Sequence, residues 1–413
     1  MTIYGDITPR TAAFAVKEML KRGMPYLVFE KFGQTYTLPT NSTKVAKFRR
    51  YFLVGSTGAA GAGNNAAPWS VPLSTAPLAE GVTPAGLNLT NQDYTITLNQ
   101  YGDFTTISDV IEDTHEDPVL QQATEVLGEQ AALTVETIRY NVLKAGVNVF
   151  YNGSVGSRLL VGSSITLANQ RSVTTAMNRQ NAKKITSVVK STPNFQTFPI
   201  GASYIAIVHP DMETDIRSLS GFTPVERYGT LTPFENEIGW VEQVRYLSST
   251  VVTPFTGAGA TMAATSTAST IAGTLLTIGG TVTGTFTVGS VIGGGTTAAG
   301  TVITALGTGT GGVGTYTVSI SQTVTSAALT GTISGIRNTA GVVDVYPVLF
   351  FGRDAYGLVP LKGATSLTPM VVNPKPSVND PLGQRGTVGW KTMQGAIILN
   401  DAWMARYETG ASS

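Results

Sequence analysis

Three glycines, Gly307, Gly309 and Gly312, have the G-x-G-x-x-G spacing with which nucleotide-binding loops approach phosphate groups. That chemistry requires a strand before the loop and a helix after it. Here residues 315–320 alternate between polar and apolar side chains instead, which is typical of a strand. The spacing therefore predicts a cluster of β-turns and not a nucleotide site.

Two groups of titratable residues are further candidates for chemistry. His209-Pro210-Asp211 contains an acid–base pair, and Glu112, Asp113, Glu116 and Asp117 form an acidic run with the residue types of a cation site. Both groups also fit the start of a helix, where negative charge is favourable, and we prefer that interpretation. The chain has no cysteine, which excludes thiolate ligands and nucleophiles. We therefore predict no catalytic residue, no metal site and no cofactor.

A basic group lies at Lys44, Lys47, Arg49 and Arg50. If this segment is a strand, Lys47 and Arg49 point to the same face, because successive side chains alternate between faces. Such a face could bind the phosphates of DNA or the acidic side chains of a neighbouring subunit. The sequence leaves both possibilities open.

The composition is poor in charge. Only 13% of the 413 residues are charged, 42% are hydrophobic, and the net charge is +1. Soluble proteins carry about a quarter of their residues charged, and charge is depleted where subunits meet. The balance excludes a protein that condenses nucleic acid through a strong positive charge. The chain begins without the pattern of a signal peptide and has no apolar run of membrane-spanning length.

A segment without charge interrupts the second half of the chain. The 91 residues from Tyr246 to Ile336 contain no Asp, Glu, Lys, Arg or His. Thr, Ser and Val alternate within it and glycines punctuate it, which favours short strands joined by tight turns. A disordered linker is the competing interpretation, because such composition also occurs in disorder. We predict a small all-β domain at 256–336, inserted into another domain.

The residues before this insert predict a long two-stranded loop. Residues 44–54 have the pattern of a strand, 55–84 are rich in Gly, Ala and Pro, and 93–100 alternate as a returning strand. An isolated hairpin of this kind is marginally stable in water, so it needs another surface to lie against. We predict that this surface belongs to another subunit.

Two helices and several strands complete an α+β fold. Residues 10–22, after Thr8-Pro9 and before Gly23, predict a capped helix. From Asp117 and Pro118, apolar residues recur at steps of three and four to about Phe150, which predicts a helix about 50 Å long. Further helices are predicted at 164–180 and 211–219, and strands at 185–189, 204–208, 241–246, 341–351 and 396–399.

Short motifs along the chain resemble the phage major capsid protein family named after coliphage N-four. They lie on both sides of the insert and cover nearly all of the chain outside it. They are Lys31-Phe32-Gly33-Gln34, Leu38-Pro39, Lys47-Phe48-Arg49-Arg50-Tyr51, residues 78–84, Tyr101-Gly102, His209-Pro210-Asp211, Asp215-Ile216-Arg217, Tyr228-Gly229, Glu237-Ile238-Gly239, residues 352–357, residues 380–386 and Trp390-Lys391.

The resemblance implies the Hong Kong 97-type coat fold, which has an N-terminal arm, an extended loop, a peripheral domain built on a spine helix, and an axial domain. The predicted elements follow this order. The arm and first strand would take 1–54, the extended loop 55–100, and the peripheral domain 101–184 with its spine helix at 118–150. Residues 185–255 and 337–413 would form the axial domain and the returning peripheral segments.

The resemblance also implies a function, that of a coat subunit assembling into hexamers and pentamers of an icosahedral shell around double-stranded DNA. The implied partners are copies of itself, a portal, a separate scaffolding protein, packaged DNA in weak contact, and a decoration protein, with no membrane; the implied place is the virion, assembled in the bacterial host's cytoplasm. An encapsulin-like compartment protein and a phage surface adhesin are the alternatives. Four residues near the loop tip are predicted to contact a neighbouring subunit, because aromatic and apolar anchors dominate interfaces. They are Trp69, Val71, Pro72 and Leu73.

Overall fold

The chain folds into two compact units. Unit 1 comprises residues 1–145 and 354–401, and unit 2 comprises residues 146–353 and 402–413. The predicted peripheral segment 101–184 is thus divided, because residues 146–184 pack within unit 2. The computed structural model describes residues 27–39, 41, 43–51, 77–78, 80–83, 91–108, 119–186, 201–228, 233–361, 367–372, 376 and 381–413. The predicted helix at 10–22, the acidic run at 112–117 and most of the extended loop lie outside these residues.

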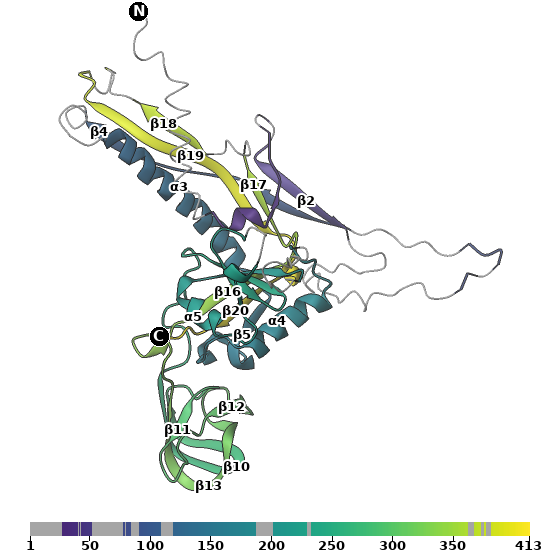
Figure 1. Cartoon of the computed structure of the whole chain (residues 1–413), viewed down its shortest axis with the longest axis vertical. Helices are drawn as coiled ribbons and strands as arrows, with labels where there is room; N and C mark the ends of the chain where they lie inside the picture. The colour runs from purple at the N-terminus through teal and green to yellow at the C-terminus, as the bar shows by residue number, and fades with distance from the viewer. Residues whose placement is uncertain are drawn as a thin grey trace, which may run out of the picture. The chain divides into compact units, whose positions relative to one another are not determined.

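A long helix, α3 (Val119–Lys144), forms the axis of unit 1 (Figure 1). Its apolar spacing buries Leu127 and Ala131 against the sheet, which confirms the helix predicted from periodicity. The predicted end near Phe150 is wrong, because the helix stops at Lys144 and the chain re-enters as strand β5 (Val149–Tyr151). Gly146 lies directly after the last turn, where glycine commonly ends helices.

The sheet of unit 1 is organised around one long strand, β19, which follows α3 along its length (Figure 1). Trp390 and Val388 of this strand pack against the buried face of α3. The sequence predicted only residues 396–399 as strand, so most of β19 was missed. The strands are β1 (Gln34–Thr35), β4 (Asn99–Ser108), β17 (Tyr356–Pro360), β18 (Thr368–Val372) and β19 (Arg385–Ile398).

The base of the predicted extended loop is an antiparallel pair, β2 (Val45–Tyr51) and β3 (Asn91–Thr97). Val45 pairs with Thr97 and Tyr51 with Asn91, so the two strands stay in register along their whole length. This pairing confirms the outgoing and returning strands. The return differs in one respect, since the predicted strand 93–100 spans the end of β3, the buried Leu98 and the start of β4.

Unit 2 is built on a mixed seven-stranded sheet in the order β5-β20-β16-β6-β9-β8-β7. Strand β6 has the bounds expected from the sequence. The run 241–246 is not one strand, because the chain turns at Glu242, which has a positive φ of 51°, and separates β8 from β9. The bounds are β6 (Tyr204–Val208), β7 (Thr223–Pro224), β8 (Glu237–Val241), β9 (Val244–Ser248), β16 (Tyr346–Phe351) and β20 (Met404–Thr409).

Helices α4 (Leu167–Arg179) and α5 (Glu213–Arg217) cover this sheet with an apolar core. The Tyr246 hydroxyl, fully buried in that core, donates a hydrogen bond to the side-chain oxygen of Gln170 on α4 at 2.8 Å. Helix α4 confirms the helix predicted at 164–180. The strand predicted at 185–189 does not form at Ile185 or Thr186, and the rest of it lies outside the described residues.

The charge-free segment is folded. Strands β10 (Ala263–Thr283) and β13 (Gly314–Thr332) pair antiparallel, and β11 (Val291–Gly293) and β12 (Ile303–Leu306) join β13. Alternate side chains point inward and form a separate apolar core that includes Phe286, Tyr316 and Leu329. This packing supports the β-structure interpretation over the disordered linker, because a solvated linker has no core.

Candidate assembly surfaces

The described part of the extended loop is its base, where β2 has two distinct faces. Ala46 and Phe48 are buried in a cluster with Ile96 and Leu98, whereas Lys47 and Arg49 point outward. The predicted sharing of one face by Lys47 and Arg49 is therefore correct. Arg50 belongs to the opposite face and is half-buried. The predicted anchors Trp69, Val71, Pro72 and Leu73 lie outside the described residues.

Arg49 is already engaged within its own chain. Its Nε and Nη2 atoms donate to the two carboxylate oxygens of Asp93 on β3, at 2.7 and 3.0 Å. These hydrogen bonds lower the pKa of Asp93 and raise that of Arg49. The pair compensates the charge of Arg49, and this leaves Lys47 as the cation of this outward face best suited to meet a phosphate or a partner's carboxylate.

The His209-Pro210-Asp211 motif has a structural role. Nδ1 of His209 accepts the backbone N–H of Asp211 at 3.2 Å, and this caps the short 3-10 helix η8 (Pro210–Met212). The Asp211 carboxylate accepts the Tyr346 hydroxyl at 2.8 Å. Burial lowers the pKa of His209, which opposes a protonated, catalytic imidazole. The contacts agree with the helix-start interpretation, because both side chains are used to join η8 to β16.

Two other motifs meet in one buried ion pair. Glu237 accepts Nε and Nη2 of Arg245 at 2.6 and 2.5 Å and the hydroxyl of Tyr228 at 2.7 Å. Its second oxygen also accepts the backbone N–H of Phe234 at 2.9 Å. Burial, followed by the Glu237 carboxylate, raises the pKa of Tyr228 far above its usual range. The motif residues around Tyr228 and Glu237 therefore fix the local fold.

A second buried ion pair was not predicted. Glu408 of β20 is fully buried and accepts Nε and Nη2 of Arg158 at 2.6 and 2.7 Å, and Nε of Arg406 at 2.8 Å. The Arg158 guanidinium also lies 3.6 Å from the ring centroid of Phe255, the residue just before the insert. Arg158 and Glu408 are 250 positions apart, so no local pattern in the sequence connects them.

The base of the insert is packed against the segment that contains Arg158. The Thr287 hydroxyl donates to the carbonyl of Leu160, and the backbone N–H of Ala260 donates to the carbonyl of Val161 at 2.9 Å. A Cβ atom at Gly162 would lie 2.7 Å from the Thr287 methyl group. The insert is therefore joined to unit 2 by a tight interface and not by a free tether.

The glycine pattern at 307–312 serves the packing of the insert. A Cβ atom at Gly309 would lie 2.3 Å from the ring of Tyr316, and one at Gly307 would lie 2.7 Å from the carbonyl of Thr315. The glycines let this turn lie directly on β13, as the β-turn interpretation predicts. Among the residues that the structure describes, no group of His, Asp or Glu has the arrangement of a metal site. No helix in those same ranges is long and apolar enough to cross a membrane.

Comparison with known proteins agrees with this absence of catalytic geometry. Residues 92–274 match the family described as phage capsid protein. This segment belongs to the phage capsid protein family. It runs from β3 through α3 and the first part of unit 2 into β10, so it contains the elements on which both units are built.

Solved capsid structures share the fold over the whole chain. The capsid of Ralstonia phage GP4 is 12% identical with a TM-score of 0.54, and the match covers 92% of this chain and 87% of that one. The cyanophage Pam1 capsid is 12% identical with a TM-score of 0.52, and the match covers 95% and 92% of the two chains. No curated protein sequence matches the chain.

These matches confirm the α+β, Hong Kong 97-type fold of tailed-phage coats that the motifs predicted. The protein is a structural capsid protein and not an enzyme, and its place is the capsid of the virion. The narrower resemblance to the coliphage N-four family stays a prediction. At this level of identity the solved structures carry the fold alone, so the contacts between subunits follow as proposals.

Proposed function

We propose that this chain is the major subunit of the icosahedral shell of a tailed phage, arranged in hexamers and pentamers around double-stranded DNA. The observation that carries the proposal is the capsid-family match in a chain whose two units have the coat fold. Purified particles should appear as closed, DNA-filled shells in negative-stain micrographs. Shells filled with an enzyme would favour the encapsulin-like alternative, and fibres would favour the adhesin.

The extended loop is proposed to lie on a neighbouring subunit. The support is that β2 and β3 bury apolar side chains on one face only, so a loop that continues from them has limited surface of its own to cover. Trp69, Val71, Pro72 and Leu73 would supply the apolar contacts, as aromatic anchors do at interfaces.

Deletion of residues 68–78 should abolish shell assembly while the isolated subunit still folds. The loss follows because every subunit would lack its main contact with the next one. Sedimentation of expressed protein, with circular dichroism of the soluble fraction, measures both effects. Trp69→Ala should reduce assembly strongly, and Ser70→Ala, its neighbour, should not. Normal yields of shells from the deletion variant would contradict the role of the loop.

The insert is proposed to stand on the outer face of the shell. Its strands expose mainly threonine and serine, and its lack of charge avoids long-range repulsion among many copies. An epitope tag placed in the β10–β13 module at Gly300, where a Cβ atom would contact nothing within 4 Å, should be recognised by antibody on intact particles. Recognition only after the shells are disrupted would place the insert inside or at an interface.

The remaining partners follow from the proposed assembly. A portal and a separate scaffolding protein would act during assembly, and a decoration protein would bind the outer face. Lys47, with weaker help from the compensated Arg49, would make non-specific contact with DNA or a salt bridge to a neighbour. Arg50 is the least suited of the three because its side chain is half-buried on the other face of β2.

A further inference from the structure

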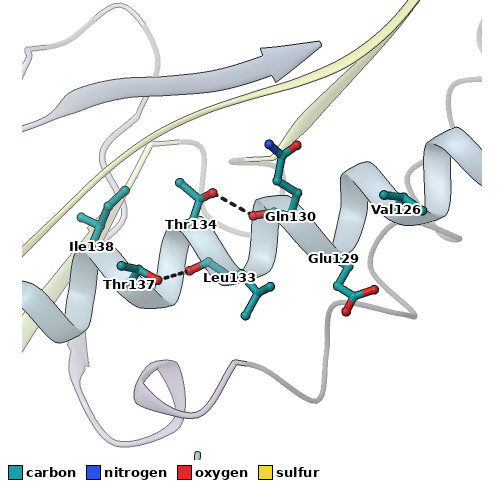
Figure 2. Close-up of a pocket in the computed structure, with 7 residues that line it drawn as sticks. All are labelled: Val126, Glu129, Gln130, Leu133, Thr134, Thr137 and Ile138. Atoms are coloured by element: carbon teal, nitrogen blue, oxygen red, sulfur yellow. Dashed lines mark hydrogen bonds between the residues drawn. The ribbon is translucent and has the colours of Figure 1, made fainter. Parts of the chain in front are cut away.

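An apolar pocket follows the outer face of α3. Its seven described lining residues all come from this helix (Figure 2). The Thr134 and Thr137 hydroxyls donate to the carbonyls of Gln130 and Leu133, four residues earlier, at 2.8 and 2.7 Å. Because these hydroxyls are used within the helix, the pocket is less polar than its sequence implies. It is lined by Val126, Glu129, Gln130, Leu133, Thr134, Thr137 and Ile138.

The N-terminal part of the chain is anchored at one end of this pocket. The backbone N–H of Phe29 donates to Glu136 at 3.4 Å, and the Phe29 carbonyl accepts the Tyr356 hydroxyl at 2.6 Å. The Phe29 ring also stacks on Tyr140 with centroids 6.4 Å apart. Residues 1–26 therefore begin beside the C-terminal end of the pocket, since Glu136 and Tyr140 flank Ile138.

Residues 10–22 have the length and the pattern to fill it. As a helix they would be about 20 Å long, and the pocket from Val126 to Ile138 spans about 18 Å. In a helix Ala12, Val16 and Met19 would form an apolar stripe, because they recur at steps of three and four. Residues 23–28 reach at most about 20 Å, which is enough to join Arg22 to the anchored Phe29.

The charges of the two segments are opposite. Residues 10–22 contain four basic residues, Arg10, Lys17, Lys21 and Arg22, against the single acid Glu18. The stretch of α3 from Val119 to Ile138 contains three glutamates and no basic residue. We propose that residues 10–22 form an amphipathic helix that docks, antiparallel to α3, in the pocket of the same chain. The occupant is this segment because it is tethered at one end of the pocket and matches it in length, apolarity and charge.

Disulfide trapping tests the docking directly, because the chain has no native cysteine. Met19→Cys with Leu133→Cys, and separately Ala12→Cys with Val126→Cys, should form a disulfide within one chain under mild oxidation. The control, Lys21→Cys with Leu133→Cys, places the thiol on the opposite side of the helix and should react at least about tenfold more slowly. Equal rates for Met19→Cys and Lys21→Cys would overturn the docking. Disulfide-linked dimers would overturn the same-chain occupant in favour of a second copy.

A proteolysis experiment keeps the proposal testable if a cysteine variant folds poorly. In the full-length protein, trypsin should cleave slowly after Lys17, Lys21 and Arg22. Leu133→Lys places a positive charge in the pocket and should raise that cleavage rate about tenfold by releasing the helix. Gln122→Lys adds the same charge on α3 away from the pocket lining and should leave the rate unchanged. Equal cleavage of the wild type and Leu133→Lys would overturn the proposal.

Discussion

Arg158→Ala is expected to destabilise unit 2 by about 3 kcal/mol, because it leaves a fully buried carboxylate with one of its two cations removed. Glu408 is 0% exposed and lies in β20, between β16 and β5. Arg406 remains in the variant, but it reaches only Oε1, whereas Arg158 binds both oxygens. The stacking of Arg158 over Phe255 is lost as well.

A matched control separates burial from the loss of an ion pair as such. Arg171 also binds a glutamate, Glu242, through two nitrogens, but the two side chains are 58% and 38% exposed. Arg171→Ala should therefore cost less than about 1 kcal/mol, because solvent screens exposed pairs. Hydrogen exchange of unit 2 amides measures both variants without assuming that the whole chain unfolds in one step.

A second substitution tests the cause of the destabilisation. Glu408→Gln in the Arg158→Ala background removes the uncompensated charge and should recover part of the lost stability, because a neutral amide is less costly to bury than a carboxylate. Equal destabilisation by Arg158→Ala and Arg171→Ala, or no recovery in the double variant, would show that the buried charge is not the determinant.

The elements that could be predicted are those whose signal is local. Helix α3 and strand β6 follow from periodicity and from an apolar run, and the insert from alternation combined with glycine. Strand β19 was largely missed because glycines weaken its strand pattern. The structure explains two of them, since a Cβ atom at Gly389 would lie 2.8 Å from the Asp103 carbonyl and one at Gly395 would lie 2.6 Å from Ile96.

The hairpin of β8 and β9 shows a different limit. Val-Glu-Gln-Val reads as continuous strand, because glutamate rarely adopts the positive φ found at Glu242. The buried ion pairs could not be predicted for a third reason, since Arg158 and Glu408, or Glu30 and Arg139, meet only when distant segments pack. For the candidate surfaces, the sequence identified the outward face of Lys47 and Arg49 but could not predict that Asp93 compensates Arg49.

Glu136 is expected to make the stability of unit 1 fall as the pH rises from 5 to 8. This carboxyl is fully buried on α3, where Arg139 of the same helix donates to it at 3.2 Å. The facing groups are Glu30 of the 3-10 helix η3 (Phe29–Lys31), which also binds Arg139, and the Tyr356 hydroxyl of β17. Burial raises the pKa of Glu136 from 4.5 to about 7, although Arg139 and the Phe29 N–H oppose the shift.

The sign follows from the raised pKa. Between pH 4.5 and 7 the folded state holds a proton that the unfolded chain has lost, so the stabilisation is complete below pH 4.5 and disappears as the pH passes 7. At 1.36 kcal/mol per pKa unit, the change amounts to about 3 kcal/mol. Its main structural effect should be at Phe29, whose N–H is bound by Glu136, so amide exchange there should accelerate above pH 7.

Glu136→Gln isolates this contribution, because glutamine keeps an acceptor for the Phe29 N–H and cannot titrate. The variant should show a nearly flat stability of unit 1 across this range, and the difference from the wild type should grow as the pH falls. His209 titrates in unit 2 with a lowered pKa, so its contribution has the opposite sign and cancels between the two proteins. Parallel pH profiles of the wild type and the variant would contradict the buried proton, and a flat variant beside a sloping wild type would assign the slope to Glu136.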